Sequence, residues 1–390
     1  MPRWITISII CLVLSGCSEA VVHVWSSNSE IALLTELYNE IEDDTVLFFH
    51  HDPYTDRHVR LQDVQVDVAI GYDLHHEIYK DYLISLERDI ERIDYIYPAI
   101  DDFFGSWIIP VMFDLPVIVS QSEIDNFGFG IRLDQLSNIV GMTEEERLRY
   151  FNPLWQTEFL VFALRVGGVR FFEGESGDIE WNNETLLENI EFLREWNRQI
   201  AGLDAQKRFE EQNFTVPLAR VAQLDRIDRF WATASTFFST NQLDRDGLRP
   251  RWLQNENGIL VYRALSAGIP RASRQKKQAK AFLRWMMNPE TQRRYLAAKE
   301  TLGSRRFGFV GGFSTLYTIN EEEIQEEFDS VRMPLATEMF FSLPQVRAWE
   351  DYTSQIVEPW IENYINEPES PKTTIELASE TQKWIYQNVR

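Results

Sequence analysis

The chain has 390 residues, of which 44% are hydrophobic, and it carries a net charge of −23. This length exceeds the roughly 250–300 residues at which a single core divides, so we expect two compact domains. The acidic surface repels phosphate backbones and anionic lipid, which excludes nucleic acid as an expected partner.

The N-terminal segment has the pattern of a secretory signal. Arg3 precedes an apolar run from Ile5 to Leu14, and the small residues Ser15 and Gly16 follow. A helix that spans a bilayer needs ~20 apolar residues, and this run is shorter. We therefore predict a signal peptide over residues 1–16.

The end of this segment, Leu14-Ser15-Gly16-Cys17, resembles the bacterial lipobox. The resemblance implies that Cys17 is lipidated and that residues 17–21 form a tether. It also implies a membrane-anchored lipoprotein of the periplasm or cell surface. The only other cysteine, Cys11, lies in the signal segment, so the mature chain has no disulfide framework. An ordinary signal peptide with an incidental cysteine is the alternative.

The next residues alternate between strand and helix patterns. Val21–Trp25, Thr45–His51 and Val64–Gly71 are short apolar runs typical of strands. Between the first two, apolar residues recur at helical spacing over 31–41, and Ser27 with Glu30 predicts a capping box. Strand, helix and strand in this order predict a parallel sheet with covering helices.

A different pattern begins at Gly105. The apolar stretch from Gly105 to Gln121 contains Pro110 and Pro116, and proline is poorly tolerated in a central strand. This predicts a strand pair or a segment that crosses between domains. Further on, the patterns predict helices over 155–166, 182–200 and 275–287, a strand over 258–269 and a helical tail from residue 344. No repeat or long linker separates two halves, so we expect interleaved lobes.

Several of these segments, in this order, resemble bacterial extracellular solute-binding proteins of the maltose-binding-protein type, the capture subunits of ABC importers. The resemblance is carried by Leu265–Pro270, Ala279–Leu283 and Asn288–Gln292, with support from Asp67–Ile70 and from Leu343–Gln345 with Trp349. It spans nearly the whole mature chain.

The resemblance implies an α/β, two-lobed periplasmic-binding-protein fold with a hinge of crossing strands and a ligand cleft between the lobes. Residues 22–112 and 265–312 would form the first lobe. Residues 113–264 and 313–390 would form the second lobe, with the C-terminal helices. Ligand would enter the cleft and the lobes would close by hinge motion.

Sites in open α/β sheets form at the carboxyl ends of strands, so the loops after the first and third strands are expected to reach the ligand. The resemblance adds one position in the crossing segment and four in the second lobe. The predicted ligand-binding residues are Trp25, Ser26, Ser27, Asn28, Tyr72, Asp73, Asp114, Trp155, Glu158, Phe238 and Trp349. For each aromatic residue, core packing is the alternative.

All six histidines fall between His23 and His76. Adjacent strand residues such as His50 and His51 point to opposite faces, and no metal-ligand spacing is present. We predict no metal and no cofactor, and we keep His75 as a candidate cleft residue. The basic run from Arg271 to Arg294 is either a docking surface for a permease or a solvated helix face.

The predicted function is a lipid-anchored substrate-binding component that captures a small solute, a sugar by its aromatic content, and delivers it to permease subunits as a monomer. Two alternatives stay open. One is a surface lipoprotein that binds another protein. The other is a glycoside hydrolase, which needs two carboxylates at a suitable separation. The sequence has no nucleophile elbow and no phosphate-binding glycine loop, and we predict no catalytic residue.

Overall fold

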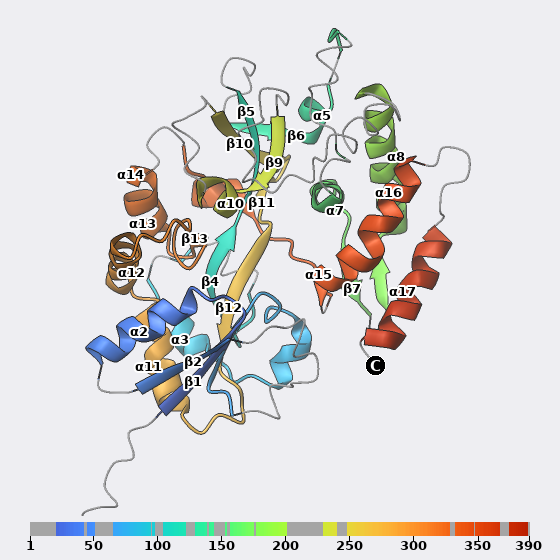
Figure 1. Ribbon diagram of the computed structural model, residues 1–390. Helices are drawn as coiled ribbons and strands as arrows, with labels where there is room; N and C mark the ends of the chain where they lie inside the picture. The colour runs from blue at the N-terminus through green and yellow to red at the C-terminus, as the bar shows by residue number, and fades with distance from the viewer. Residues whose placement is uncertain are drawn as a thin grey trace, which may run out of the picture.

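The protein is described by a computed structural model that covers residues 21–42, 45–50, 65–94, 96–97, 104–121, 129–138, 140–143, 153, 157–174, 177–200, 229–239, 248–327, 332–346, 348–366 and 374–388. The predicted signal peptide, Cys17 and Trp155 lie outside these residues. Two main sheets with covering helices form two lobes (Figure 1). None of the helices in the described residues has both the length and the apolar character needed to span a bilayer.

The first lobe is built on a six-stranded sheet of order β13-β4-β12-β3-β1-β2. Its strands are β1 (Val21–Ser26), β2 (Thr45–His50), β3 (Val68–Gly71), β4 (Ile109–Asp114), β12 (Arg263–Gly268) and β13 (Phe313–Ser314). β1 is parallel to β2 and to β3, which confirms the predicted parallel arrangement. β12 runs antiparallel to β3 and β4, so the sheet as a whole is mixed.

Three helices cover one face of this sheet: α2 (Ile31–Ile41), α11 (Lys276–Met286) and α12 (Pro289–Thr301). The helix over 31–41 coincides with the predicted periodic run, but the predicted start at a capping box of Ser27 and Glu30 is wrong. Glu30 is the N-cap and its side chain makes no capping bond. The turn is held instead by Asn28, whose Oδ1 accepts a hydrogen bond from the Glu30 amide at 3.0 Å.

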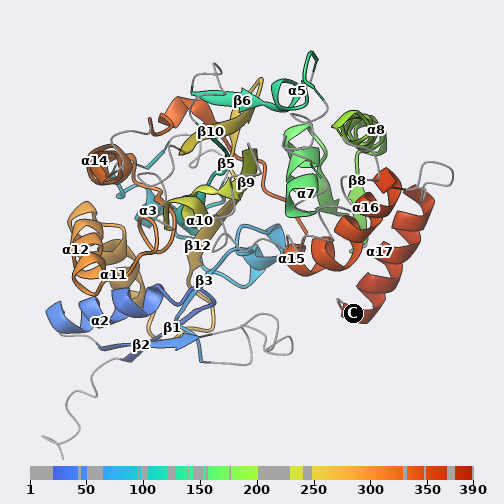
Figure 2. The same cartoon turned by 45° about the horizontal axis from the view of Figure 1, so that its top comes forward.

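The second lobe has a sheet of order β14-β11-β10-β5-β9, with β6 beside β10. Its strands are β5 (Pro116–Gln121), β6 (Gly130–Arg132), β9 (Arg229–Thr233), β10 (Leu248–Asn255), β11 (Gly258–Leu260) and β14 (Met339–Phe340). Helices α7 (Thr157–Val166), α8 (Asn183–Ile200), α16 (Glu358–Asn366) and α17 (Thr374–Asn388) stand beside it (Figure 2). Gly168, at φ +90°, ends α7 in the left-handed conformation that the Gly167-Gly168 pair predicts.

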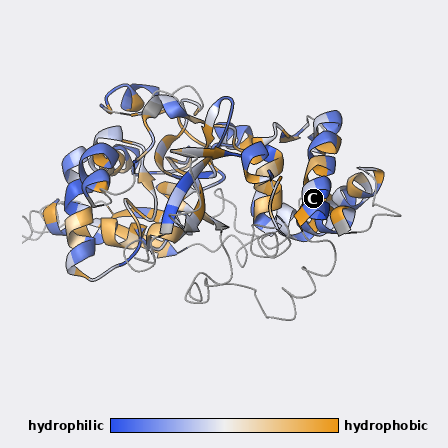
Figure 3. Cartoon of the chain, turned by 90° about the horizontal axis from the view of Figure 1, so that it is seen from above, coloured by the Kyte–Doolittle hydropathy of each residue, from blue (hydrophilic) through white to orange (hydrophobic). Residues whose placement is uncertain are grey.

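Shorter elements connect these parts. They are η1 (Glu77–Asp81), α3 (Glu87–Ile90), α5 (Leu133–Leu136), the pair β7 (Phe171–Glu173) and β8 (Ile179–Trp181), α10 (Ala234–Ser239), α13 (Tyr317–Ile319), η4 (Asn320–Ile324), α14 (Gln325–Glu327), η5 (Ala336–Glu338), α15 (Trp349–Tyr352) and η6 (Thr353–Val357). Hydrophilic and hydrophobic residues share the same helices, as expected for helices that bury one face (Figure 3).

The described strands change between the two main sheets three times. One change lies between β13 and β14, and the other two lie at adjacent places. Leu115 alone separates β4, in the first sheet, from β5, in the second, which confirms the predicted crossing segment. Val261 and Tyr262 separate β11 from β12, so the single strand predicted over 258–269 is two strands in different sheets. In Figure 1, β4 and β12 lie side by side; β4 runs toward the second sheet and β12 runs back from it.

One predicted domain boundary is wrong. β13 pairs with β4 in the first sheet, and Leu316 and Ile319 are part of the first-lobe core. Residues 313–319 therefore belong to the first lobe, because the side chains after the strand are buried against α12 and the sheet.

A buried cation ties α7 to the crossing segments. Arg165, only 7% exposed, donates to the carbonyls of Tyr262 at 2.9 Å, Val261 at 3.0 Å and Ser342 at 3.1 Å. Burial lowers the pKa of Arg165 to about 10, so the side chain stays cationic at neutral pH. This one side chain thus donates hydrogen bonds to three backbone carbonyls that lie in irregular connections and lack partners in a sheet.

We expect Arg165→Met to lower the free energy of unfolding by about 2–4 kcal/mol, because it leaves these carbonyls without their donors. Urea denaturation followed by far-UV circular dichroism would measure the change. Arg165→Lys, which keeps the charge but not the planar fork, should give a smaller loss. An unchanged midpoint in Arg165→Met would show that water replaces the guanidinium at no cost.

Candidate functional site

Three segments meet at the carboxylate of Asp114, between the two sheets. Asp114 is fully buried, and its Oδ1 accepts hydrogen bonds from the amides of Leu115 and Ser235, both at 3.0 Å. Its Oδ2 accepts from the Ser235 hydroxyl and lies 3.6 Å from the Arg263 guanidinium. The Asp114 carbonyl also accepts from the Tyr262 amide at 2.9 Å. We call Asp114, Ser235 and Arg263 the hinge cluster.

The hinge cluster carries two aromatic neighbours. The Arg263 guanidinium lies 5.0 Å from the centroid of the Tyr72 ring and 5.9 Å from that of Tyr262. Burial acts to lower the pKa of Arg263, but its neighbours, Tyr72 and Asp114 first among them, reverse this and raise it. The Arg263 side chain is 35% exposed, so a charged donor close to two aromatic rings is partly accessible.

Asp73, next to Tyr72, lies within electrostatic range of two carboxylates of the other lobe. Burial and, to a smaller extent, the charges of Glu350 and Asp351 together raise the pKa of Asp73 to about 7. Glu350 and Asp351 belong to α15, which starts at Ala348 with φ +49°, a conformation that non-glycine residues rarely adopt. α15 runs into the π-helical turn η6, and π-turns are frequent at functional sites.

Two histidines of the same loop contact the second lobe. His75 lies with Nδ1 2.9 Å from the Tyr72 carbonyl and Nε2 3.0 Å from the Pro344 carbonyl. Burial lowers the pKa of His75, so the ring is neutral and donates to one carbonyl at a time. His76 Nε2 lies 4.0 Å from Glu173 Oε1. His75, kept from the sequence as a candidate cleft residue, therefore lies between the lobes.

The structure brings together only part of the predicted site. Tyr72 and Asp73 join the hinge cluster and α15, and Glu158, exposed in the first turn of α7, acts electrostatically on Tyr262. Ser26 and Asn28 do not join them, because their side chains hold the loop before α2. Ser26 Oγ accepts from the Asn28 amide at 3.0 Å, and Asn28 Nδ2 donates to the Val310 carbonyl at 2.7 Å. Ser27 in the same loop is half-buried.

Three predicted ligand contacts have structural roles instead. Asp114 has no exposed surface and is held by the hinge bonds. Phe238 is 2% exposed, and its ring stacks on Phe307 at 4.9 Å in the core between the sheets. Trp25 packs against the small cluster around Leu83 on the sheet face away from α2. Asp114 and Phe238 are therefore buried, whereas Trp25 is half-buried.

Trp349 is half-buried and packs on the second-lobe core, with its ring centroid 5.2 Å from that of Phe171. Its indole positions α15, whose next two residues face Asp73. Sequence reasoning missed Arg263, Tyr262 and Glu350. Arg263 and Tyr262 lie in the run 258–269, which the sequence predicts as one continuous strand. Glu350 follows Trp349, which is predicted as a ligand contact for its aromatic ring alone.

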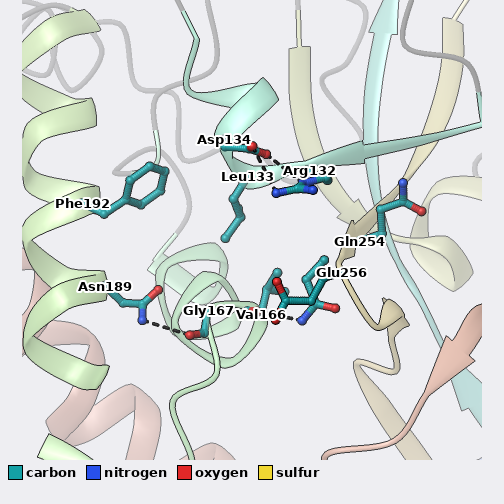
Figure 4. Close-up of a pocket in the computed structure, with 10 residues that line it drawn as sticks. Arg132, Leu133, Asp134, Val166, Gly167, Asn189, Phe192, Gln254 and Glu256 are labelled. Carbon is teal, nitrogen blue, oxygen red and sulfur yellow. Dashed lines mark hydrogen bonds and ion pairs between the residues drawn. The ribbon is translucent and has the colours of Figure 1, made fainter. Parts of the chain in front are cut away.

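A separate open pocket of about 220 Å³ lies in the second lobe (Figure 4). Its polar groups are occupied: Asn189 donates to the Gly167 carbonyl at 3.0 Å and Asn255 to the Val166 carbonyl at 2.9 Å, which caps α7. Arg132 and Asp134 at its rim pair with each other at 3.0 Å. No predicted site residue lines this pocket. Within the described part of the chain, no group of His, Cys, Asp and Glu is arranged to hold a metal ion.

We expect Asp114→Ala to lower the free energy of unfolding by about 2–3 kcal/mol, because two amides and a hydroxyl lose a charged acceptor. Asp114→Asn keeps one carbonyl oxygen for the amides and should cost less. Thermal denaturation of the two variants would measure both effects. Equal, negligible losses would contradict the structural role assigned to Asp114.

Asp73 generates a pH prediction. The pKa of Asp73 is raised in the folded state, so the unfolded chain loses this proton near the ordinary aspartate pKa of 3.8 and the folded chain only near 7. The free energy of unfolding therefore falls as pH rises through this interval. Asp73→Asn removes the effect, and its stabilisation relative to the wild type should grow between these pH values and then stay constant. Because Asp73 is half-buried, solvent screening limits the gain to about 1–2 kcal/mol. Melting curves across this range test it, and a destabilised Asp73→Asn at high pH would contradict it.

Comparison with known proteins places the fold. No protein-family model and no curated protein matches the chain. Among solved structures it is similar to the sugar-binding protein MalE from Xanthomonas citri, with 12% identity, a TM-score of 0.66 and coverage of 94% of this chain and 99% of that one.

Thiaminase I from Clostridium botulinum, in complex with thiamin, is similar over 88% of this chain and 99% of its own, with 14% identity and a TM-score of 0.61. The spermidine/putrescine ABC transporter substrate-binding protein PotD from Streptococcus pneumoniae is similar over 88% and 98%, with 16% identity and a TM-score of 0.51. At these identities the likeness establishes the fold. The chain thus has the two-lobed α/β fold of periplasmic binding proteins, as the resemblance in its sequence predicts.

Proposed function

We propose that this protein is a lipid-anchored substrate-binding component of an ABC importer, which captures a small solute between its lobes and delivers it to a permease. The observation that carries the proposal is one group of side chains close to the points where the chain crosses between the two sheets. The group consists of Tyr72, Asp73, Arg263 and Glu350. Tyr72 and Asp73 follow the carboxyl end of β3, the position at which open α/β sheets bind ligands.

The chemistry of this group suits a carbohydrate. Tyr72 and Tyr262 supply flat rings whose centroids lie 5.0 and 5.9 Å from the Arg263 guanidinium, which is a charged donor. Asp73 and Glu350 supply carboxylate acceptors, and a charged acceptor bonds a hydroxyl more strongly than a neutral one. Rings that pack on sugar faces and charged groups that bind hydroxyls thus meet in one place.

The charge balance supports a role in binding. Asp73 opposes two carboxylates of the other lobe, which costs stability in the free protein. Perturbed titrating groups concentrate at functional sites. A ligand that donates hydrogen bonds to these carboxylates would offset the repulsion and favour approach of the lobes, because a ligand shifts an equilibrium by its preference for one state.

The hinge geometry supports closure. Two of the three crossings, at Leu115 and at Val261–Tyr262, lie side by side and are tied by the hinge cluster. Small changes in backbone dihedrals at such points move whole lobes. Contacts of His75 and His76 with the second lobe already join the two sides.

One observation favours a second candidate, a glycoside hydrolase. A carboxyl group with a pKa of about 7 can act as a general acid near neutral pH, and Asp73 has carboxylates nearby that could act as its partner. The enzyme among the structural neighbours shows that this fold accommodates catalysis. An assay for reducing sugar released from a bound oligosaccharide distinguishes the two, because a binding protein returns the ligand intact.

A thermal-shift screen of the mature chain against mono- and oligosaccharides, polyols, amino acids and polyamines tests the proposal. A ligand at about 100 times its dissociation constant adds about 2.7 kcal/mol to stability, which raises the midpoint visibly. We expect a sugar to raise it, and Asp73→Asn and Arg263→Met to abolish the rise. Asp134→Asn, an exposed carboxylate at the separate pocket, is the matched control. A ligand-dependent rise that survives both site variants would place the ligand elsewhere, and silence across the library would favour a protein partner.

A further inference from the structure

The basic residues at the start of α11 lie at the base of the first lobe, beside the start of β1. β12 runs antiparallel to β3, so the turn after Gly268 emerges where β3 and β1 begin. Ser273 in this turn donates to Asp67 Oδ1 at 2.6 Å, and Asp67 Oδ2 accepts from the His23 amide at 3.0 Å. Arg271, Arg274, Lys276 and Lys277 surround Ser273, and we call these four residues the basal patch.

The basal patch differs from the rest of the basic run in its charge partners. Lys280 and Arg284 pair with Asp89, and Arg293 pairs with glutamates of η4. The four basal residues are exposed, and none of them forms an ion pair with a residue in the described ranges. Arg271 donates to the Leu83 carbonyl at 2.9 Å, which positions the guanidinium without neutralising it.

The predicted lipid anchor connects to this same end of the lobe. Cys17 is four residues before Val21, the first residue of β1. Four residues span at most about 14 Å, so an anchored chain holds the base of the first lobe against the lipid headgroups. This step rests on the lipid anchor of the proposed function.

We propose that the basal patch binds anionic lipid headgroups beside the anchor. Charges separated by more than about 8 Å are largely screened at physiological ionic strength, so the local patch outweighs the net charge of −23 at the contact. The carboxyl ends of β1 and β3, with Tyr72 and Asp73, lie at the opposite end of the strands. The contact therefore orients the candidate ligand site away from the membrane, toward the solution from which solute arrives.

The test uses the mature chain coupled through the Cys17 thiol, its only thiol, to a maleimide lipid in vesicles. Hydrogen exchange of the 271–277 amides is compared on vesicles of phosphatidylcholine alone and of phosphatidylcholine mixed with phosphatidylglycerol. We expect exchange to slow by about fivefold on the anionic vesicles. Exchange at residues 72–76 should not change.

Arg274→Glu, Lys276→Glu and Lys277→Glu combined should abolish this protection. Arg271 is left in place because it holds the turn. The matched control combines Arg170→Glu, Arg198→Glu and Lys383→Glu, three exposed basic residues of the second lobe, and should keep the protection. Circular dichroism confirms that both triple variants fold.

Equal exchange on the two vesicles overturns the proposal, and so does protection that survives the basal triple variant. A basal variant that loses solute uptake while vesicle protection is unaffected assigns the patch to the permease instead. The chemical tether makes this result independent of the natural anchor. The anchor is tested by Cys17→Ala in cells, where the protein should leave the membrane fraction.

Discussion

Three separated segments of the chain meet at one buried carboxylate, that of Asp114. The carboxylate accepts hydrogen bonds from the amides of Leu115 and Ser235, and the main-chain carbonyl of Asp114 accepts one from the amide of Tyr262. The chain changes sheets at the first and third of these places, so each lobe takes its orientation from this junction. A buried carboxylate is tolerated there because three hydrogen bonds and the Arg263 guanidinium at 3.6 Å compensate its charge. The junction at Asp114 therefore also sets the position of residues on the crossing strands, in particular Arg263.

The buried and half-buried carboxylates of the protein fall into two groups. Burial alone would raise the pKa of Asp67 and Asp89. Hydrogen bonds from Ser273 and His23 to Asp67, and from Lys280 and Arg284 to Asp89, more than reverse this and lower the pKa of both. Burial raises the pKa of Asp73, and its acidic neighbours add to the increase. The first group stabilises the fold, whereas ionised Asp73 costs stability in the free protein.

The candidate site shows how far sequence reasoning reaches. The rule that ligands bind at the carboxyl ends of strands identified Tyr72 and Asp73, because the strand before them is a clear apolar run. It could not identify Arg263, because Tyr262 and Arg263 lie in the apolar run 258–269, which looks like one strand in the sequence. Only the structure shows that this run forms β11 and β12, which pair in different sheets. Nor could it separate Phe238, in the core, from an exposed ring, because helical periodicity does not say which neighbour covers a face.

The sequence by itself determined the α/β class, the periodic core of helices such as Ile31–Ile41, the crossing at 105–121 and the presence of a lipidation pattern at Cys17. These depend on local periodicity, on proline and glycine, and on short motifs. Only the tertiary structure decided which lobe receives residues 313–319, which carboxylates gain donors, and that Asp73 faces α15 from the other lobe. Those outcomes depend on contacts between residues far apart in the chain, and no local pattern encodes the partner.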